Sequence, residues 1–152
     1  MKISRIQLHQ LMPKIVKWAE AQAKQITAGG DPLNAEQVAL AHQVGVTHPD
    51  RVRVQTVQKI PMPTDPILRS AAQSSGLCSP SVVGMTFGYS ICLRNGWHRS
   101  IRLLSHELRH VHQFEKAGTL GQIIPAHLND VLTYGPIMAP HEIDARAFEV
   151  ID

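Results

Sequence analysis

The chain has 152 residues, a length that suits one ordinary hydrophobic core, so we expect a single domain. Hydrophobic residues make up 43% of the chain and charged residues 18%, a composition typical of globular rather than disordered proteins. The net charge of +3 comes without a basic run or an aromatic-interleaved patch, which argues against nucleic-acid binding.

The cysteine content and the N-terminal residues favour a cytoplasmic protein. Cys78 and Cys92 lack the spacing of a disulfide framework or of a cysteine zinc site, so we expect two reduced, buried thiols. The first residues contain no long apolar stretch, and we expect neither a signal peptide nor a segment that binds or spans a membrane.

The N-terminal part of the chain predicts two helices. Residues 1–12 fit either a helix or a strand, whereas apolar residues at helical spacing predict a helix over about 12–28. Pro13 suits the first turn of that helix, and Gly29-Gly30 stop it. A second helix is expected over about 34–45, because Asn34 can cap its N-terminus.

The middle of the chain predicts two strands separated by a short helix. Residues 51–57 alternate and are β-branched, which is typical of a strand. The prolines within 61–66 make a stiff connector, and a short helix is expected over about 65–75. Residues 76–84 are expected to form a loop, and residues 85–94 alternate between polar and apolar side chains, which predicts the second strand.

Helices dominate the rest of the chain. The turn dipeptide Asn95-Gly96 is expected to close a hairpin onto a short piece at 97–98. Apolar residues at a period of 3.6 predict a helix over 100–116. Another is expected over 120–134, where Pro125 can break or kink it, and a last one begins near Pro140.

The helix predicted over 100–116 contains an H-E-x-x-H sequence, His106-Glu107-Leu108-Arg109-His110. Residues four apart lie about 40° apart around a helix, so His106 and His110 can direct two ring nitrogens at one ion. Glu107 flanks the same opening and can accept the proton of a zinc-bound water. The motif therefore indicates a catalytic zinc site.

A catalytic zinc ion needs a third protein ligand and one open position. We favour Glu142, because it begins a predicted helix and the small Ala145 one turn later lets two helices approach closely. Asp144 is the alternative third ligand, and in the absence of a metal either acid would only stabilise a helix N-terminus. His141 can act as a ligand or, like Tyr134, donate a hydrogen bond to an oxyanion beside the metal.

These two segments resemble the zincin metallopeptidases of the gluzincin type, in particular the small, single-domain, minigluzincin-like members. His106, Glu107 and His110 match the H-E-x-x-H of the active-site helix, and Glu142-Ile143-Asp144-Ala145 matches the E-x-x-A of the following helix. The resemblance covers roughly residues 85–150. It implies that the chain hydrolyses peptide or protein substrates with Zn²⁺ bound to His106, His110 and Glu142.

The chain departs from the family pattern at one position. Several gluzincin subgroups have an aspartate directly after the alanine of E-x-x-A, and this chain has Arg146. The hydrogen-bond partner that orients the ligand histidines is therefore unassigned, and Asp144 or Asp130 can fill that role.

The resemblance also implies a role for the strand predicted over 85–94. In zincins the edge strand before the motif helix pairs with an extended peptide, because its unpaired backbone groups offer hydrogen bonds. Phe87, Tyr89 or Ile91 would then line a side-chain subsite. The alternative is an ordinary strand within the sheet.

Together these observations predict an α+β, zincin-like single domain over residues 1–152, with a small mixed or antiparallel sheet and four to six helices. Residues 1–75 would supply N-terminal helices and a strand, and residues 76–152 the metal-binding core. The predicted function is zinc-dependent peptide-bond hydrolysis with Glu107 as the base. Two alternatives remain open: a catalytically silent metal-binding or protein-interaction module, and a helical adaptor in which the motif arises by chance from nine histidines.

Overall fold

A computed structural model describes residues 3–77 and 79–151 of the chain. This part of the chain contains six α-helices and one four-stranded mixed sheet, so the α+β class predicted from the sequence is confirmed. Within it, no helix is both long enough and apolar enough to cross a membrane. Cys78 lies outside the described residues, and the prediction for its thiol stays a prediction.

The sheet joins the two halves of the chain. Its strands lie in the order β1 (Asp31–Pro32), β2 (Arg53–Val57), β4 (Ser90–Arg94), β3 (Gly84–Phe87). β2 and β4 run parallel, with Arg53 opposite Ser90, while β1 and β3 each run antiparallel to their neighbour. β3 therefore forms an edge of the sheet and directly precedes β4 in the chain.

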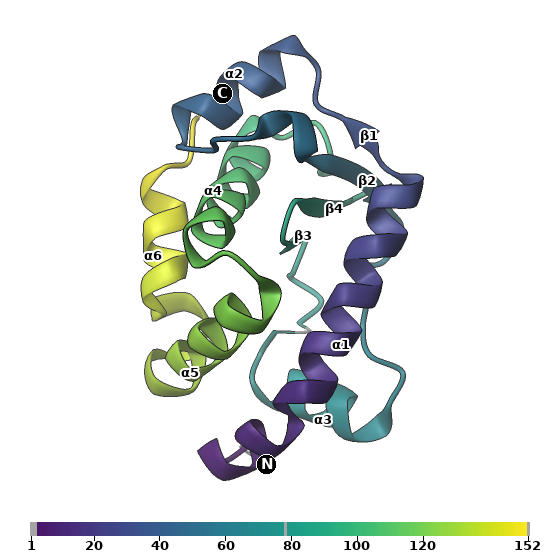
Figure 1. The fold of residues 1–152 in the computed structure, drawn as a ribbon, viewed down its shortest axis with the longest axis vertical. Coiled ribbons are helices and arrows are strands. Elements are labelled where there is room, and N and C mark those ends of the chain that lie inside the picture. The colour runs from purple at the N-terminus through teal and green to yellow at the C-terminus, as the bar shows by residue number, and fades with distance from the viewer. Residues whose placement is uncertain (1–2, 78, 152) are drawn as a thin grey trace.

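Two helices cover opposite faces of this sheet. The long helix α1 (Arg5–Gly29) packs on the face that carries Phe87 and Cys92, where Trp18 contacts Phe87 edge to face at 5.5 Å. The motif helix α4 (Ile101–Ala117) packs on the other face, against Ile91 and Leu93. Figure 1 shows α1 and α4 on the two sides of the strands.

The position of α4 follows from its sequence. Ser100 caps its N-terminus by accepting a hydrogen bond from the backbone N–H of Leu103, and Gly118 ends it with a positive φ of 100°. Leu104, Leu108 and Val111 share one side of the helix and are buried against the sheet. The side chains two positions further along lie about 200° around the helix. They consequently lie outside the part of α4 that is buried against Ile91 and Leu93.

The remaining helices surround this core. They are α2 (Ala35–Gln43), the 3₁₀ turn η1 (Pro49–Arg51), α3 (Pro66–Ser74), α5 (Leu120–Met138) and α6 (Pro140–Ala147). Figure 1 shows α6 alongside α4, with α5 next to both.

The predicted start of the first helix was wrong. α1 begins at Arg5 rather than near residue 12, because Ser4 and Gln7 form a reciprocal capping box that starts the helix earlier. Pro13 consequently lies inside the helix and not in its first turn. The helix predicted over 120–134 is confirmed: α5 continues through Pro125, and its backbone leaves helical geometry at Gly135, where φ is 85° and ψ is 166°.

The prediction of one continuous strand over 85–94 was also wrong. A turn at Gly88-Tyr89 divides the segment into β3 and β4, and Gly88 takes the positive φ of 69° that the turn requires. The turn contains two residues, so the alternation of side chains continues across it and hides the break. Residues 95–99 form turns, and the predicted short strand at 97–98 is absent from the described structure.

The Cys92 side chain is fully buried between the sheet and α1. Burial, together with the charge of Glu107, raises the pKa of its thiol to about 12. At pH 8 only about one thiol in 10⁴ would then be the reactive thiolate. We expect native protein at pH 8 to resist iodoacetamide at Cys92 and protein in guanidinium to react, which mass spectrometry of the Cys92 peptide will measure. Equal labelling of Cys92 in both states would contradict this burial.

Candidate metal centre

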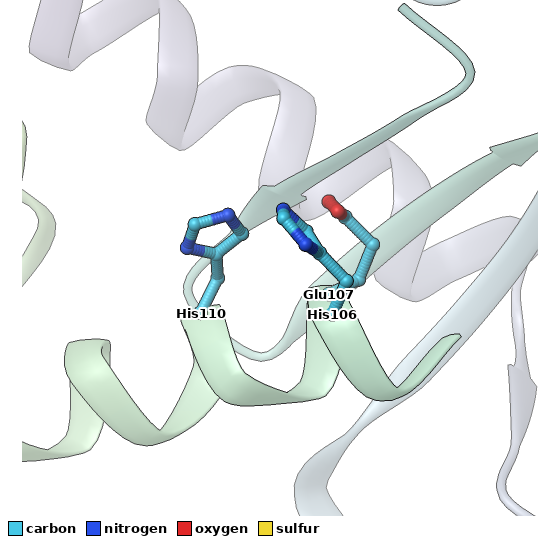
Figure 2. Close-up of side chains that lie close together, drawn as sticks. All are labelled: His106, Glu107 and His110. Carbon is cyan, nitrogen blue, oxygen red and sulfur yellow. The ribbon is translucent and has the colours of Figure 1, made fainter. Parts of the chain in front are cut away.

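Three side chains of the motif leave the same side of α4, as Figure 2 shows. One donor atom each from His106, Glu107 and His110 lies within 4.8 Å of the other two. Helix geometry produces this arrangement, because His106 and His110 are four residues apart and Glu107 is turned by about 100° from its neighbour. These residues form the group in the described structure that can hold a metal ion.

Helix α6 adds a second carboxylate to the two histidines. Glu142, in its first turn, places Oε1 3.0 Å from Nε2 of His110 and Oε2 3.1 Å from Nε2 of His106. Ala145 is fully buried, and its small side chain suits the close approach of α6 to α4. Tetrahedral zinc with bonds of about 2.0–2.1 Å separates neighbouring ligand atoms by about 3.3 Å. The two distances from Glu142 oxygens to the imidazole nitrogens, 3.0 and 3.1 Å, are close to that separation.

The other ring nitrogen of each histidine has its own partner. Nδ1 of His106 lies 2.8 Å from Oε2 of Glu149, and Nδ1 of His110 lies 2.8 Å from Oε1 of Gln113. A carboxylate or amide oxygen can only accept, so each Nδ1 is the donor. Each Nε2 faces Glu142 and donates to its carboxylate, and it is this Nε2 proton that a metal ion would displace. Glu149 also accepts a hydrogen bond from Arg102. It is the orienting partner of His106 that the sequence left unassigned, because Arg146 stands where several gluzincin subgroups have an aspartate.

The charges of the protein groups favour a cation at this position. Burial alone would lower the pKa of His110, but the hydrogen bond to Glu142 and the charge of Glu107 outweigh burial and raise this pKa to about 9. The same groups raise the pKa of His106. Burial would raise the pKa of Glu142, but hydrogen bonds from both histidines hold it far below its usual range. A metal ion supplies positive charge in the same place and displaces protons from Nε2.

Glu107 lies between α4 and the edge strand β3. Its side chain is buried, and its Oε1 accepts a hydrogen bond of 3.0 Å from the Thr86 hydroxyl. Gly84 allows β3 to pass close to Glu107, because a β-carbon at this position would lie only 3.2 Å from Cγ of the glutamate. Burial, opposed by the charges of the two histidines, raises the pKa of Glu107. A carboxyl group with a raised pKa is suited to proton transfer.

A pair of stacked histidines, which the sequence did not reveal, lies beside the site. The rings of His127 and His141 are parallel, with an angle of 1° and centroids 3.8 Å apart. An imidazole binds a metal in its own plane, so two stacked rings cannot share one ion. Burial, and then the charge of its neighbour, lowers the pKa of His127 to about 3, and burial lowers the pKa of His141. Both rings are therefore neutral at pH 7.

The other residues singled out from the sequence lie in different places. Asp144 faces Arg109, which binds both of its carboxylate oxygens, at 2.8 and 3.1 Å. Tyr134 is 56% exposed and does not line the cavity described below. Among the described contacts, Asp130 makes no hydrogen bond or ion pair with a ligand histidine.

The predicted subsite residues are divided in the same way. Phe87 belongs to β3 and lines the cavity. Tyr89 lies in the hairpin turn and donates a hydrogen bond to Glu115, while Ile91 is fully buried in the core on β4. Only Phe87 of the three can contact a ligand in the cavity.

A cavity of about 680 Å³ adjoins the glutamate and histidine side chains. It lies between β3 and five helices, α1, α3, α4, α5 and α6, and its wall is mostly apolar, with contributions from Leu8, Trp18, Leu68, Phe87, Leu103 and Leu128. The charged side chains of its wall, Arg102, Glu107, Glu142 and Glu149, all belong to the metal-centre end. A large apolar pocket with a few convergent polar groups is the usual form of a small-molecule or substrate site.

No known protein family, curated protein or solved structure matches the chain. The chemistry of this centre must accordingly be argued from its own residues.

Proposed function

We propose that this chain is a zinc-dependent peptidase. The observation that supports the proposal is the convergence of Glu142 on Nε2 of both His106 and His110, at 3.0–3.1 Å, with Glu107 alongside. Two imidazoles and one carboxylate with a remaining open position form the ligand set of many hydrolytic zinc sites. Zinc is favoured over copper or iron because of this donor set and expected geometry.

The residues of the chain divide the work between them. His106, His110 and Glu142 would hold the ion, which when bound supplies Lewis acidity to a carbonyl and to a water. Glu107 would take a proton from the attacking water and deliver it to the leaving nitrogen. Its buried position beside Thr86 holds the carboxylate in place, and its raised pKa suits a group that must both accept and donate a proton.

The edge strand β3 offers a place for an extended substrate. Arg94 donates a backbone hydrogen bond to Val83, so by the alternation of antiparallel pairing the backbone groups of Gly84 and Thr86 face away from β4. Thr86 also contacts Glu107, which places this free edge next to the proposed base. A peptide added to the edge would run past the metal centre and above the apolar cavity.

His141 and His127 would bind the carbonyl oxygen of that peptide. Nδ1 of His141 is buried and has no hydrogen-bond partner among the described residues. Both rings line the cavity, and each neutral imidazole carries one N–H. Donors held beside the reacting carbonyl stabilise the negative charge that develops on its oxygen.

Metal analysis together with an activity assay tests the proposal. We expect purified protein to contain one zinc per chain and to hydrolyse an unstructured protein such as reduced, alkylated casein. A chelator should abolish hydrolysis, and zinc should restore it. His106→Ala should lose the metal, whereas His42→Ala, a matched change at an exposed histidine of α2, should retain it. Protein without stoichiometric zinc would contradict the proposal, and bound zinc without hydrolysis would favour the silent binding module.

A further inference from the structure

Arg109, inside the H-E-x-x-H motif, points away from the metal and towards α6. Its Nε and Nη2 donate to the two carboxylate oxygens of Asp144, and its Nη1 donates to the carbonyl of Val44 at 2.8 Å. Its guanidinium also stacks on the ring of Phe148, 3.5 Å from the centroid. A planar guanidinium with contacts on three sides has one orientation, and it therefore fixes the position of the Asp144 carboxylate.

Asp144 in turn orients a glutamine. Nε2 of Gln113 donates to Oδ2 of Asp144 and to the backbone carbonyl of His141, both at 2.9 Å. These two acceptors engage both protons of the amide, so the NH₂ group must face them. The amide oxygen is then directed at Nδ1 of His110, 2.8 Å away. His110 must donate from Nδ1, which leaves Nε2, the nitrogen that faces Glu142, as the one that a metal ion would bind after displacing its proton.

We propose that Arg109, Asp144 and Gln113 form a relay of positioning residues that sets the tautomer and ring orientation of His110 for metal binding. The inference rests on the proposed zinc site. It assigns different support to the two ligand histidines, because His106 is held directly by the carboxylate of Glu149, whereas His110 is held by a neutral amide that needs two further residues behind it. The relay also ties the motif helix to α6, the helix that carries Glu142.

The simpler role for these contacts is packing of α4 against α6, and Gln113→Met separates the two roles. Methionine keeps the length of the side chain but removes the acceptor for His110. We expect the zinc dissociation constant, measured by chelator competition, to rise about 10- to 100-fold. The melting temperature of the metal-free protein should change little, because Arg109 and Asp144 still join the two helices.

Cobalt provides the readout that a packing role would not change. In Co²⁺-substituted wild-type protein, the Nδ1 protons of both ligand histidines should give shifted, slowly exchanging NMR signals. In Gln113→Met the His110 signal should exchange with solvent and disappear, while the His106 signal, protected by Glu149, remains as an internal control. The visible absorption bands of the cobalt should shift as well, because the ring is no longer held.

Further variants test the order of the relay. Arg109→Lys keeps the charge but loses the two hydrogen bonds to the Asp144 carboxylate, and it should also raise the zinc dissociation constant. Arg146→Lys, a matched change in α6 at a residue that contacts only the carbonyl of Ile137 among described side-chain bonds, should not. The double variant Gln113→Met/Asp144→Asn should lose less zinc-binding free energy than the two single variants lose together, because both changes act through one bond to His110.

Several results would overturn the relay. Zinc affinity within twofold of wild type in Gln113→Met, or retention of both cobalt-shifted N–H signals, would assign these residues to packing alone. Additive effects of Gln113→Met and Asp144→Asn would show that the two residues act independently. Tight zinc binding by the wild-type protein in any of these cases would leave the proposed function standing, whereas failure of the wild type to bind zinc would overturn both.

Discussion

Glu107→Gln should retain zinc and lose hydrolysis. Glutamine has the size of glutamate and can still accept the hydrogen bond from Thr86, so the site should keep its shape. An amide cannot take up the proton of an attacking water, and loss of a general base typically slows the chemical step by about 10²- to 10⁴-fold. We expect a decrease of that size in the rate of casein hydrolysis at saturating substrate.

The measurement pairs turnover with metal content in the same preparation. Glu20→Gln, the same chemical change at an exposed position of α1, should leave both unchanged. Undiminished hydrolysis in Glu107→Gln would exclude Glu107 as the base. Loss of zinc from that variant would instead make Glu107 a ligand, a role that its position within 4.8 Å of both histidines makes chemically reasonable.

The sequence predicted those elements whose ends carry local signals. The motif helix, expected over 100–116, runs over Ile101–Ala117 because Ser100 and Gly118 terminate it through their own side chain and backbone. α2 begins after Asn34, whose side chain caps it as expected. Errors arose where a local signal was overlooked, as with Ser4 at the start of α1, or where a two-residue turn preserved the alternation, as at Gly88.

The outer parts of the candidate site were predicted less completely than the motif. Two signals were present, because Gln113 lies three residues after His110 on one helix, and Glu149 lies seven residues after Glu142 on the same side of the expected last helix. His127 had no such signal. It belongs to another helix, and its position beside His141 depends on how α5 packs, which sequence periodicity does not specify.

Asp144 illustrates how a short spacing decides between two roles. It follows Glu142 by two residues, so the two carboxylates project about 200° apart around α6. Once α6 packs on α4, Glu142 faces the imidazoles and Asp144 faces Arg109. Sequence reasoning left both acids as candidate ligands because it had no information on which side of α6 meets α4.

Glu142→Ala should therefore weaken zinc binding more than Asp144→Ala. The first change removes a donor that contacts Nε2 of both histidines, while the second removes an oxygen that reaches His110 only through Gln113. Loss of an outer hydrogen-bond partner costs about 10- to 100-fold in metal affinity, and we expect the loss in Glu142→Ala to exceed that range. Chelator competition with purified protein measures both dissociation constants on one scale.

The two variants also differ in what remains at the site. Glu142→Ala removes the one carboxylate that contacts Nε2 of both histidines, so neutral rings become favoured and the attraction for a cation decreases. Asp144→Ala leaves that attraction in place, since Glu142 still accepts from both rings. If Asp144→Ala proved the weaker zinc binder, the third ligand would have to be reassigned to Asp144, and α6 would have to meet α4 with its opposite side.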